Sequence, residues 1–309
     1  MEKNSSSKLS NPVIASLLAI FCTFLWGSAY PAVKLGYEYF NIGADDSAYK
    51  IAFAGIRFLI SGLIVLFFYT ITNRGGKSET LRILNKEQWI KIAVLGLMQT
   101  TIHYYFYYIG LSYTSGAKAS ILNSLTVFFS ALLSHFFYTD DKISITKAFG
   151  IVIGLFAVTL VNWSPSLGLS FKIKGEFFIM MASFFAATSA LYSKRAANVV
   201  NPVLLAALQL SLGGALLLII GLAAGSPLPA SNLTGWILFA YMAILSAVVF
   251  SLWASLLKHN KVSSITVFYF LIPVFGTILS ALILKESVFQ IQYLIALPAV
   301  AIGIYLVNR

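Results

Sequence analysis

Polar and aromatic side chains recur inside long apolar stretches of this 309-residue sequence, where they could form a binding site. A polar group in lipid is costly unless it has a partner or faces water, so such groups mark candidate sites. Gln99 and His103 share one face at helical spacing, with Tyr107 beside them, and Asn123 lies on the next stretch. Amide, imidazole and phenol groups can hydrogen-bond a small polar molecule. We predict that these side chains line an aqueous cavity.

Aromatic residues on other stretches could form further walls of the same cavity. Trp26 and Tyr30 stand one turn apart in the first stretch. Aromatic rings can pack against an amino acid or a heterocycle, but they also form belts at membrane interfaces. The remaining residues that we assign to a substrate-binding site are Ser189, Tyr192, Trp253 and Tyr269.

A stripe of small polar residues offers a second interpretation for one stretch. Its members are Ser120, Asn123, Ser130 and Ser134. They could face a cavity, or the serines could form hydrogen bonds between neighbouring helices, which is a usual role for serine in membrane bundles. Both interpretations remain open at this point.

Arg57 is the one full charge well inside an apolar stretch. Its guanidinium group could attract a carboxylate or a phosphate. It could instead extend toward the membrane surface and bond backbone carbonyls, which would give it a structural role.

The sequence lacks the common catalytic and nucleotide-binding motifs. It has no Walker-type loop, no His-Glu-x-x-His, no Gly-x-Ser-x-Gly and no cysteine–histidine spacing for a metal. We therefore expect no enzyme activity, no cofactor and no bound metal. No Asp or Glu falls inside an apolar stretch, so we predict no carboxylate proton relay.

The elements that must position these side chains are membrane-spanning helices. The chain is 59% hydrophobic and 10% charged, and apolar stretches long enough to cross about 30 Å of hydrocarbon recur throughout it. Backbone groups in lipid must be bonded within their own segment, which requires helices. We predict an all-α integral membrane protein with ten transmembrane helices, at 13–34, 51–72, 90–110, 118–138, 144–163, 175–194, 202–224, 234–257, 262–284 and 289–307.

The net charge of +11 is better explained by membrane topology than by binding to nucleic acid. Basic residues concentrate in cytoplasmic segments of membrane proteins. With both termini in the cytoplasm, those segments hold fourteen of the twenty-one basic residues: Lys3, Lys8, Arg74, Lys77, Arg82, Lys86, Lys91, Lys142, Lys147, Lys194, Arg195, Lys258, Lys261 and Arg309. We predict a multi-pass protein of the cell membrane with this orientation, and no nucleic-acid partner.

The chain divides into two similar halves. Residues 164–174, which contain Pro165, Gly168 and three serines, form a predicted extracytoplasmic linker. It separates a first five-helix repeat at 1–163, with a cytoplasmic tail at 1–12, from a second repeat at 175–309. Thr126-Val127-Phe128 aligns with Pro273-Val274-Phe275. An odd number of helices per repeat makes the second copy inverted, and such pairs place a central cavity where the repeats meet.

Four stretches in order resemble the EamA-type members of the drug/metabolite transporter superfamily. They read FLWGSAYPAVKLG at 24–36, AGIRFLISG at 54–62, YYIGLSYTSGAKASIL at 107–122 and FLIPVFGTILSALILKE at 270–286. The resemblance covers essentially the whole chain. It implies ten helices, two inverted repeats around a central cavity, and transport, often export, of amino acids or related metabolites.

We therefore expect a secondary transporter, an exporter of amino acids or similar small polar metabolites that works by alternating access. Transport would be exchange or facilitated flow, or would use His103 as its titrating group. An exchanger of sugar phosphates or nucleotide sugars and a non-transporting membrane sensor remain alternatives. Gly150-x-x-x-Gly154 and Gly221-x-x-x-Gly225 favour close helix packing within a monomer, with an oligomer left open. The expected partners are a small-molecule substrate and the lipid bilayer.

Overall fold

The computed structural model describes residues 8–72, 84–114, 116–161, 171–284 and 292–309. Within these ranges the regular structure is helical, and no strand is present. The helices are η1 (Lys8–Ser10), α1 (Pro12–Tyr39), α2 (Ser47–Thr72), α3 (Lys86–Leu95), η2 (Gly96–Ile102), α4 (His103–Tyr113), α5 (Gly116–Asn123), α6 (Leu125–Phe137), α7 (Ile145–Val161), η4 (Ile173–Phe177), α8 (Phe178–Ala197), α9 (Pro202–Ala223), α10 (Leu233–His259), α11 (Val262–Thr266), η5 (Val267–Phe270), α12 (Leu271–Leu284) and α13 (Gln292–Asn308).

Asparagine residues mark the start of several helices. Asn11 and Asn201 each accept hydrogen bonds from the first free N–H groups of α1 and α9, and each is followed by a proline. Asn85 forms a capping box with Gln88 at the start of α3. Such residues satisfy N–H groups that have no partner inside the helix, and proline fits the first helical position. These boundaries are therefore encoded locally.

Seven helices in the described part of the chain are long and apolar enough to cross a membrane, and further apolar helices cover 145–160 and 295–308. The predicted span at 90–110 lies within consecutive helices from Lys86 to Tyr113, which include the π-helix η2. The predicted span at 262–284 begins with the short helix α11 and the 3₁₀ turn η5. The ends of two other predicted spans, near residues 163 and 289, lie outside the described residues.

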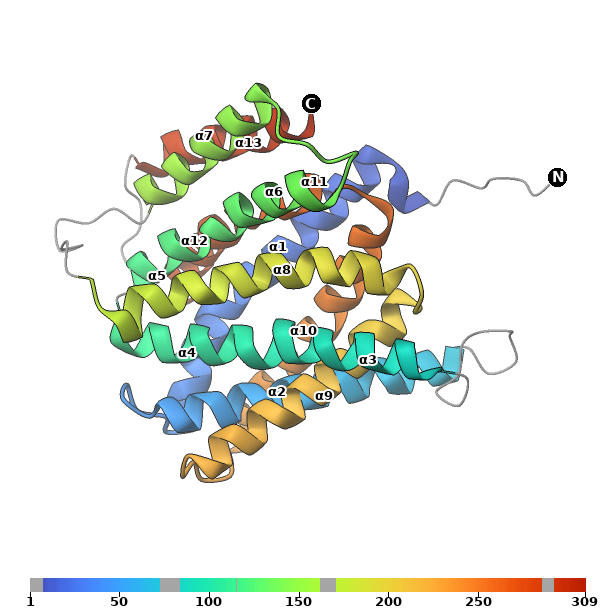
Figure 1. Cartoon of the computed structure of the whole chain (residues 1–309). Helices are drawn as coiled ribbons and strands as arrows, with labels where there is room; N and C mark the ends of the chain where they lie inside the picture. Colours follow the sequence, from blue (N-terminus) through green and yellow to red (C-terminus); the bar gives the residue numbers. More distant parts are fainter. Residues whose placement is uncertain (1–7, 73–83, 115, 162–170, 285–291) are drawn as a thin grey trace.

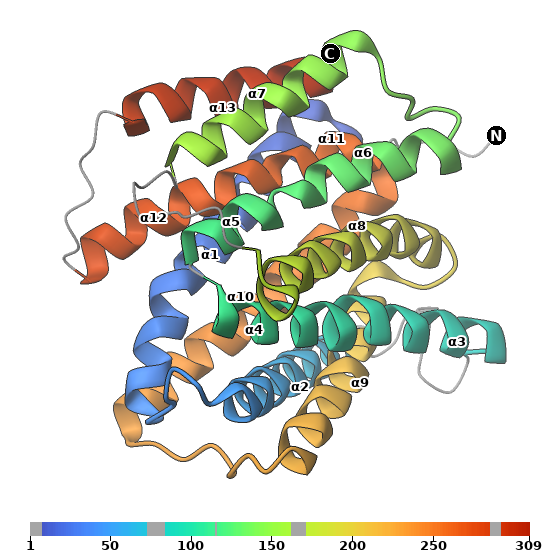
Figure 2. The same ribbon diagram turned by 60° about the vertical axis from the view of Figure 1, so that its left-hand side comes forward.

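Helices from opposite halves of the chain pair with one another. The two most extensive pairs are α2 with α9 and α7 with α13, and they form opposite edges of the molecule (Figure 1). Between these edges lie α1, α4, α8 and α10, with α6 and α12 closer to the α7–α13 pair (Figure 2). The central region is therefore built from segments far apart in the sequence.

Glycine residues permit the closest approaches within these pairs. A Cβ atom added at Gly55 of α2 would lie 2.3 Å from the backbone nitrogen of Leu218 on α9. One added at Gly150 of α7 would lie 2.8 Å from the carbonyl oxygen of Gly303 on α13. The predicted close contact at Gly150 thus occurs within one chain. Gly225 has nothing within 4 Å; its φ of +92° instead fits the end of α9.

The two chain ends lie toward the same end of the bundle. Asn260, just after α10, donates a hydrogen bond to the carbonyl oxygen of Leu9. Asp141, in the loop before α7, bonds Ser263 at the start of α11. Gly150 near the start of α7 in turn contacts Leu306 near the end of α13. This chain of contacts joins the N- and C-terminal segments at one face.

Candidate functional site

Three of the predicted aromatic residues meet at the centre of the bundle. Trp253 of α10 stacks on Tyr269 of η5, with ring centroids 4.8 Å apart and an interplanar angle of 12°. Trp26 of α1 meets both rings edge-on, at 4.9 Å from Trp253 and 5.6 Å from Tyr269. Phe250 of α10 extends the group toward α2, because its ring is 5.7 Å from Trp26 and 6.0 Å from Phe58. We call Trp26, Phe250, Trp253 and Tyr269 the central aromatic cluster.

Tyr30, His103 and Tyr107 form a second group beside this cluster. Tyr30 and Tyr107 lie close enough for their hydroxyl groups to interact. The His103 ring lies parallel to that of Tyr107, with centroids 6.2 Å apart. Its Nδ1 is 3.0 Å from the carbonyl oxygen of Ala182 on α8. If that nitrogen donates, the other ring nitrogen remains free to accept a hydrogen bond.

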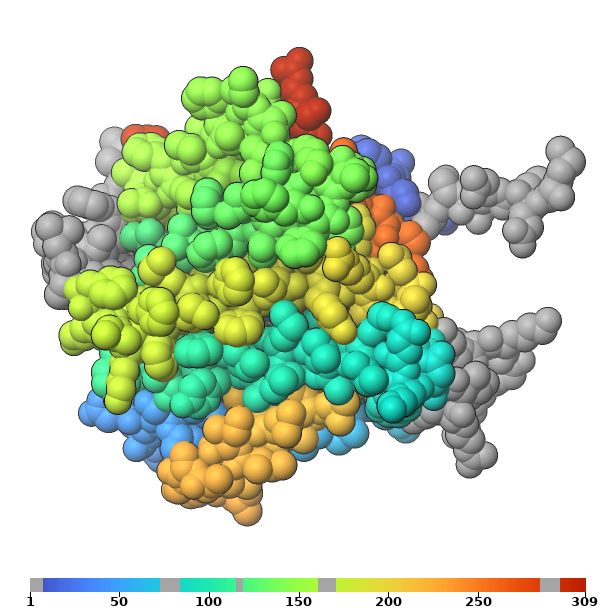
Figure 3. Space-filling view, viewed as in Figure 1, coloured from blue at the N-terminus to red at the C-terminus, as the bar shows by residue number. Residues whose placement is uncertain are grey.

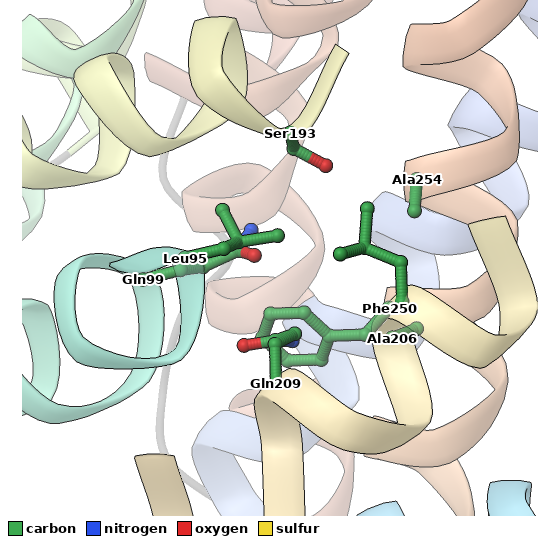
Figure 4. A pocket seen from close by; sticks show the side chains of 8 residues that line it. Leu95, Gln99, Ser193, Ala206, Gln209, Phe250 and Ala254 are labelled. Carbon is green, nitrogen blue, oxygen red and sulfur yellow. The ribbon is translucent and has the colours of Figure 1, made fainter. Parts of the chain in front are cut away.

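Gln99 does not join the group formed by Tyr30, His103 and Tyr107; it faces α9 and α10 instead. It borders a narrow gap without room for a water molecule (Figure 4). The opposite wall carries Gln209 of α9, whose side-chain oxygen accepts a 2.8 Å hydrogen bond from Thr100. The π-helix η2 contains Gln99 and changes the helical phase between it and His103. The other residues bordering the gap are Leu95, Ser193, Leu205, Ala206, Phe250 and Ala254.

Gln209 is a candidate that our sequence analysis did not include. It is buried on all sides and lies in the strongly apolar run AALQLSLGG of α9. The signal was available, because a single amide inside an apolar helix needs a partner. What the sequence did not reveal was that Thr100, over a hundred residues away, supplies that partner.

Asn123 and the serine stripe remain unsatisfied in the structure. The side-chain oxygen of Asn123 and the hydroxyl groups of Ser120, Ser130 and Ser134 are buried without a hydrogen-bond partner. Hydrogen bonding between helices therefore does not explain these serines. Unpaired buried hydroxyl groups cost free energy, so these serines do not stabilise the bundle through hydrogen bonds.

Two predicted residues, Ser189 and Tyr192, make other contacts. Ser189 of α8 is buried, and its hydroxyl donates to the carbonyl oxygen of Ala186 in its own helix, at 2.9 Å. Tyr192 packs with Tyr69, Ile92 and Leu204, among other side chains of α2, α3 and α9. Their positions indicate local packing in this conformation.

Arg57 lies in the membrane-spanning part of α2 and faces aromatic rings. Only 5% of its surface is exposed, and its guanidinium carbon is 4.4 Å from the centroid of Phe58. Tyr37 and Tyr104 lie close enough to Arg57 to interact electrostatically. Tyr104 also interacts with Tyr30, so Arg57 adjoins the tyrosine–histidine group.

Several of the predicted residues gather in the middle of the bundle. They offer ring faces, phenol and amide groups and one cation, which are groups that orient a ligand without reacting with it. Within the described ranges no group of three or more His, Cys, Asp or Glu residues is placed to hold a metal ion. Helices α3, α4 and α8 lie across the middle of the face in Figure 3, with α6 and α7 above them and α9 below.

The fold and this site define a multi-pass integral membrane protein with polar groups buried among apolar helices. The model of the EamA-like transporter family matches residues 13–163 and again 173–309. The chain belongs to this family, and it is a multi-pass membrane transporter.

Relatives along nearly the whole chain are also described as transporters. An uncharacterized transporter of Synechocystis sp. is 26% identical over 98% of this chain and 92% of its own length. The uncharacterized transporter YvbV of Bacillus subtilis is 26% identical over 95% of this chain and 91% of its own. The uncharacterized inner membrane transporter YedA of Escherichia coli is 24% identical, covering 96% and 90%. A solved crystal structure shares the fold, with a TM-score of 0.74 at 17% identity over 93% of this chain and 95% of that one.

Proposed function

We propose that this protein is a secondary transporter that exports amino acids or related small polar metabolites by alternating access. The observation that carries the proposal is the central aromatic cluster. Trp26 comes from the first half of the chain, whereas Trp253 and Tyr269 come from the second. A ligand bound against this cluster would touch both halves, so a rocking motion of the halves would change the side from which it is reached.

The proposed architecture is ten spans in two inverted five-helix repeats, with both termini in the cytoplasm. Three observations support it. The family model matches the chain twice, on either side of the predicted linker. Helices in corresponding positions of the two halves pair, as α2 does with α9 and α7 with α13. The two chain ends lie at one end of the bundle, as ten spans require.

Counterflow in proteoliposomes tests the proposed function. Vesicles containing the purified protein are loaded with one unlabelled amino acid or metabolite, and uptake of the same labelled compound is followed. We expect uptake of at least one compound of the panel above that of protein-free vesicles. Trp26→Leu should reduce this uptake about tenfold or more, since it removes a wall shared by the halves. Trp89→Leu, a change at a partly exposed tryptophan of α3, is the matched control.

The two alternatives give different results in the same assay. Uptake confined to sugar phosphates or nucleotide sugars would replace the amino-acid assignment. Binding of a compound without any flux would favour a membrane sensor. Flux measured in membrane vesicles of both orientations decides between export and import.

A further inference from the structure

A buried cation without a counter-ion lies on α2. The Nε of Arg57 is buried and has no hydrogen-bond partner, and no carboxylate in the described ranges forms an ion pair with the guanidinium. A charge removed from water normally requires pairing, because its desolvation costs several kcal/mol. The contact with the Phe58 ring returns only part of this, about 2 kcal/mol at most. Arg57 is therefore held in an unfavourable state.

The structural interpretation of Arg57 does not account for this state. An arginine that anchors a helix extends to the membrane surface or bonds backbone carbonyl oxygens. Arg57 is buried, and its Nε reaches no carbonyl oxygen. It lies ten residues after the start of α2 at Ser47, which is about 15 Å along the helix.

The hydroxyl group of Tyr37 is a second hydrogen-bond donor near Arg57. The hydroxyl oxygen of Tyr37 on α1 is buried without a hydrogen-bond partner, and this side chain interacts electrostatically with Arg57. A guanidinium group only donates hydrogen bonds, and a tyrosine hydroxyl donates one. Arg57 and Tyr37, whose hydroxyl group also lies close to Tyr108, thus offer two buried donors to one acceptor. The complement of such a pair is an anion.

A second cation lies toward the end of the bundle that we assign to the outside. Lys50 is seven residues before Arg57, which places it on the same face of α2 at a distance of about 10 Å. It is 8% exposed, and its ammonium group bonds the carbonyl oxygen of Ala44 and lies 5.7 Å from the centroid of the Tyr37 ring. No carboxylate in the described ranges forms an ion pair with it. The carboxylates of Asp45 and Asp46 lie near enough to interact with Lys50 electrostatically and offset part of its charge.

We propose that Arg57 and the Tyr37 hydroxyl bind the carboxylate group of the transported molecule. This assignment rests on the proposed function and narrows it to carboxylate-bearing metabolites. One guanidinium group matches a carboxylate, which accepts two parallel hydrogen bonds from it. A phosphate dianion would favour a second free cation at the same group, whereas the Lys50 ammonium group already bonds the carbonyl oxygen of Ala44.

The position of Tyr104 indicates where the rest of the ligand lies. This side chain stands between Arg57 and Tyr30, and its ring is 4.3 Å from that of Phe58. Phe58 in turn contacts Phe250 of the central aromatic cluster. A carboxylate at Arg57 therefore directs the body of the molecule toward Trp26 and Tyr269.

Thermal unfolding of the full-length detergent-purified protein tests the assignment with matched probes. Acetate, propionate, benzoate, glycine and phenylalanine are each compared with the corresponding primary amide, which has nearly the same shape but no negative charge. Inorganic phosphate is a separate probe. A ligand that binds the folded state raises the unfolding midpoint in proportion to its affinity and concentration. We expect at least one carboxylate to stabilise the protein and its amide to have no such effect.

Variants locate the effect at the proposed donors. Arg57→Gln should weaken carboxylate binding about tenfold or more, because it removes a charged pair of hydrogen bonds. Tyr37→Phe removes one oxygen atom, keeps the ring, and should weaken binding several-fold, about 3- to 10-fold. Lys258→Gln removes a positive charge from the last turn of α10, away from Arg57 and Tyr37, and should leave binding unchanged. If Arg57→Gln fails to fold, Tyr37→Phe decides the question alone.

Three results would overturn the assignment: no probe carboxylate stabilises the protein, stabilisation survives both substitutions, or phosphate alone stabilises it. Failure of the proposed function has a different signature. If carboxylates stabilise the protein through Arg57 but no compound shows counterflow, the anion site stands and the transport proposal falls. If flux of uncharged compounds persists without any carboxylate effect, transport stands and the anion site falls.

Discussion

Two buried charge clusters in this protein show opposite degrees of pairing. Near the end of the bundle that holds both termini, Asp141 is 1% exposed, and both of its oxygens are engaged. One accepts from Lys147 at 2.7 Å and from the Ser263 hydroxyl, and the other accepts from the Ser263 backbone N–H at 3.0 Å. On α2, Arg57 has neither an anion nor a carbonyl at its Nε. The proposed carboxylate of the substrate would supply the partner that Arg57 lacks.

The paired cluster ties the two halves of the chain together. Asp141 and Lys147 belong to the first half, and Ser263 belongs to the second. Burial alone would raise the pKa of the Asp141 carboxyl, but the hydrogen bonds from Lys147 and Ser263 outweigh it and hold the pKa below its usual range. The paired charge is therefore structural, and the contrast with Arg57 can be tested by substitution.

The largest expected effect comes from breaking the paired cluster. Asp141→Ala leaves the Lys147 ammonium group buried without its counter-ion, which should lower the free energy of unfolding by about 3–5 kcal/mol. Denaturant titration of the detergent-purified protein measures this. Asp140→Ala is the matched control, because the neighbouring carboxylate is exposed. Equal effects of the two substitutions would contradict a structural role for the cluster.

Methionine in place of Lys147 and methionine in place of Arg57 should change the stability of the protein in opposite directions. Lys147→Met removes the partner of Asp141 and should destabilise the protein by about 3–5 kcal/mol. Arg57→Met removes an unpaired charge from an apolar setting, so the ligand-free protein should keep its stability or gain about 1–2 kcal/mol. Thermal unfolding of both variants without carboxylates tests the contrast. Destabilisation by Arg57→Met as large as that by Lys147→Met would show that Arg57 is paired after all.

A smaller effect is expected at the satisfied neutral contact between Thr100 and Gln209. Gln209→Leu leaves the Thr100 hydroxyl buried without its 2.8 Å acceptor and should cost about 1–2 kcal/mol. Adding Thr100→Val should recover part of the loss, because neither polar group then remains unpaired. A double-mutant cycle measured by denaturant titration gives the interaction energy. A coupling near zero would mean that the contact does not form.

Mild acidification should change the stability contributed by Asp141 least of all. Because the pKa of Asp141 is lower in the folded protein than in the unfolded chain, its contribution to stability is fully present above the unfolded value, about 4. It is lost only as the pH falls through the folded pKa. The difference in unfolding midpoint between the wild type and Asp141→Asn should therefore stay constant from pH 8 to 5 and shrink below about pH 4. A difference that shrinks between pH 7 and 5 would be inconsistent with a lowered pKa.

Several features of the fold could be predicted from local sequence. Apolar runs of about 20 residues require helices in lipid, and seven helices of that kind are present in the described ranges. The asparagine caps at Asn11 and Asn201 mark two helix starts. The π-helix η2 and the 3₁₀ turn η5 were not predicted. Neither leaves a periodic signal in the sequence, since such irregular turns depend on what packs against them.

The candidate site could be predicted only in part. Trp26, Trp253 and Tyr269 were selected from the sequence and lie together in the structure. Tyr192 has the same type of ring but packs with a different group of helices. Residue type alone does not separate these cases, because an aromatic ring lowers the free energy equally well in a site wall or in a packed core.

By itself, the sequence determined that this chain is a helical membrane protein, because the cost of unbonded backbone groups in lipid leaves an apolar segment few alternatives. It also indicated some of the polar residues that would be buried, such as Arg57. The tertiary structure decided which of them are satisfied. Asp141 finds Ser263 across 122 residues of sequence, and the Nε of Arg57 finds no partner. Pairing depends on distances of a few ångströms between separate helices, and those distances exist only once the helices have packed.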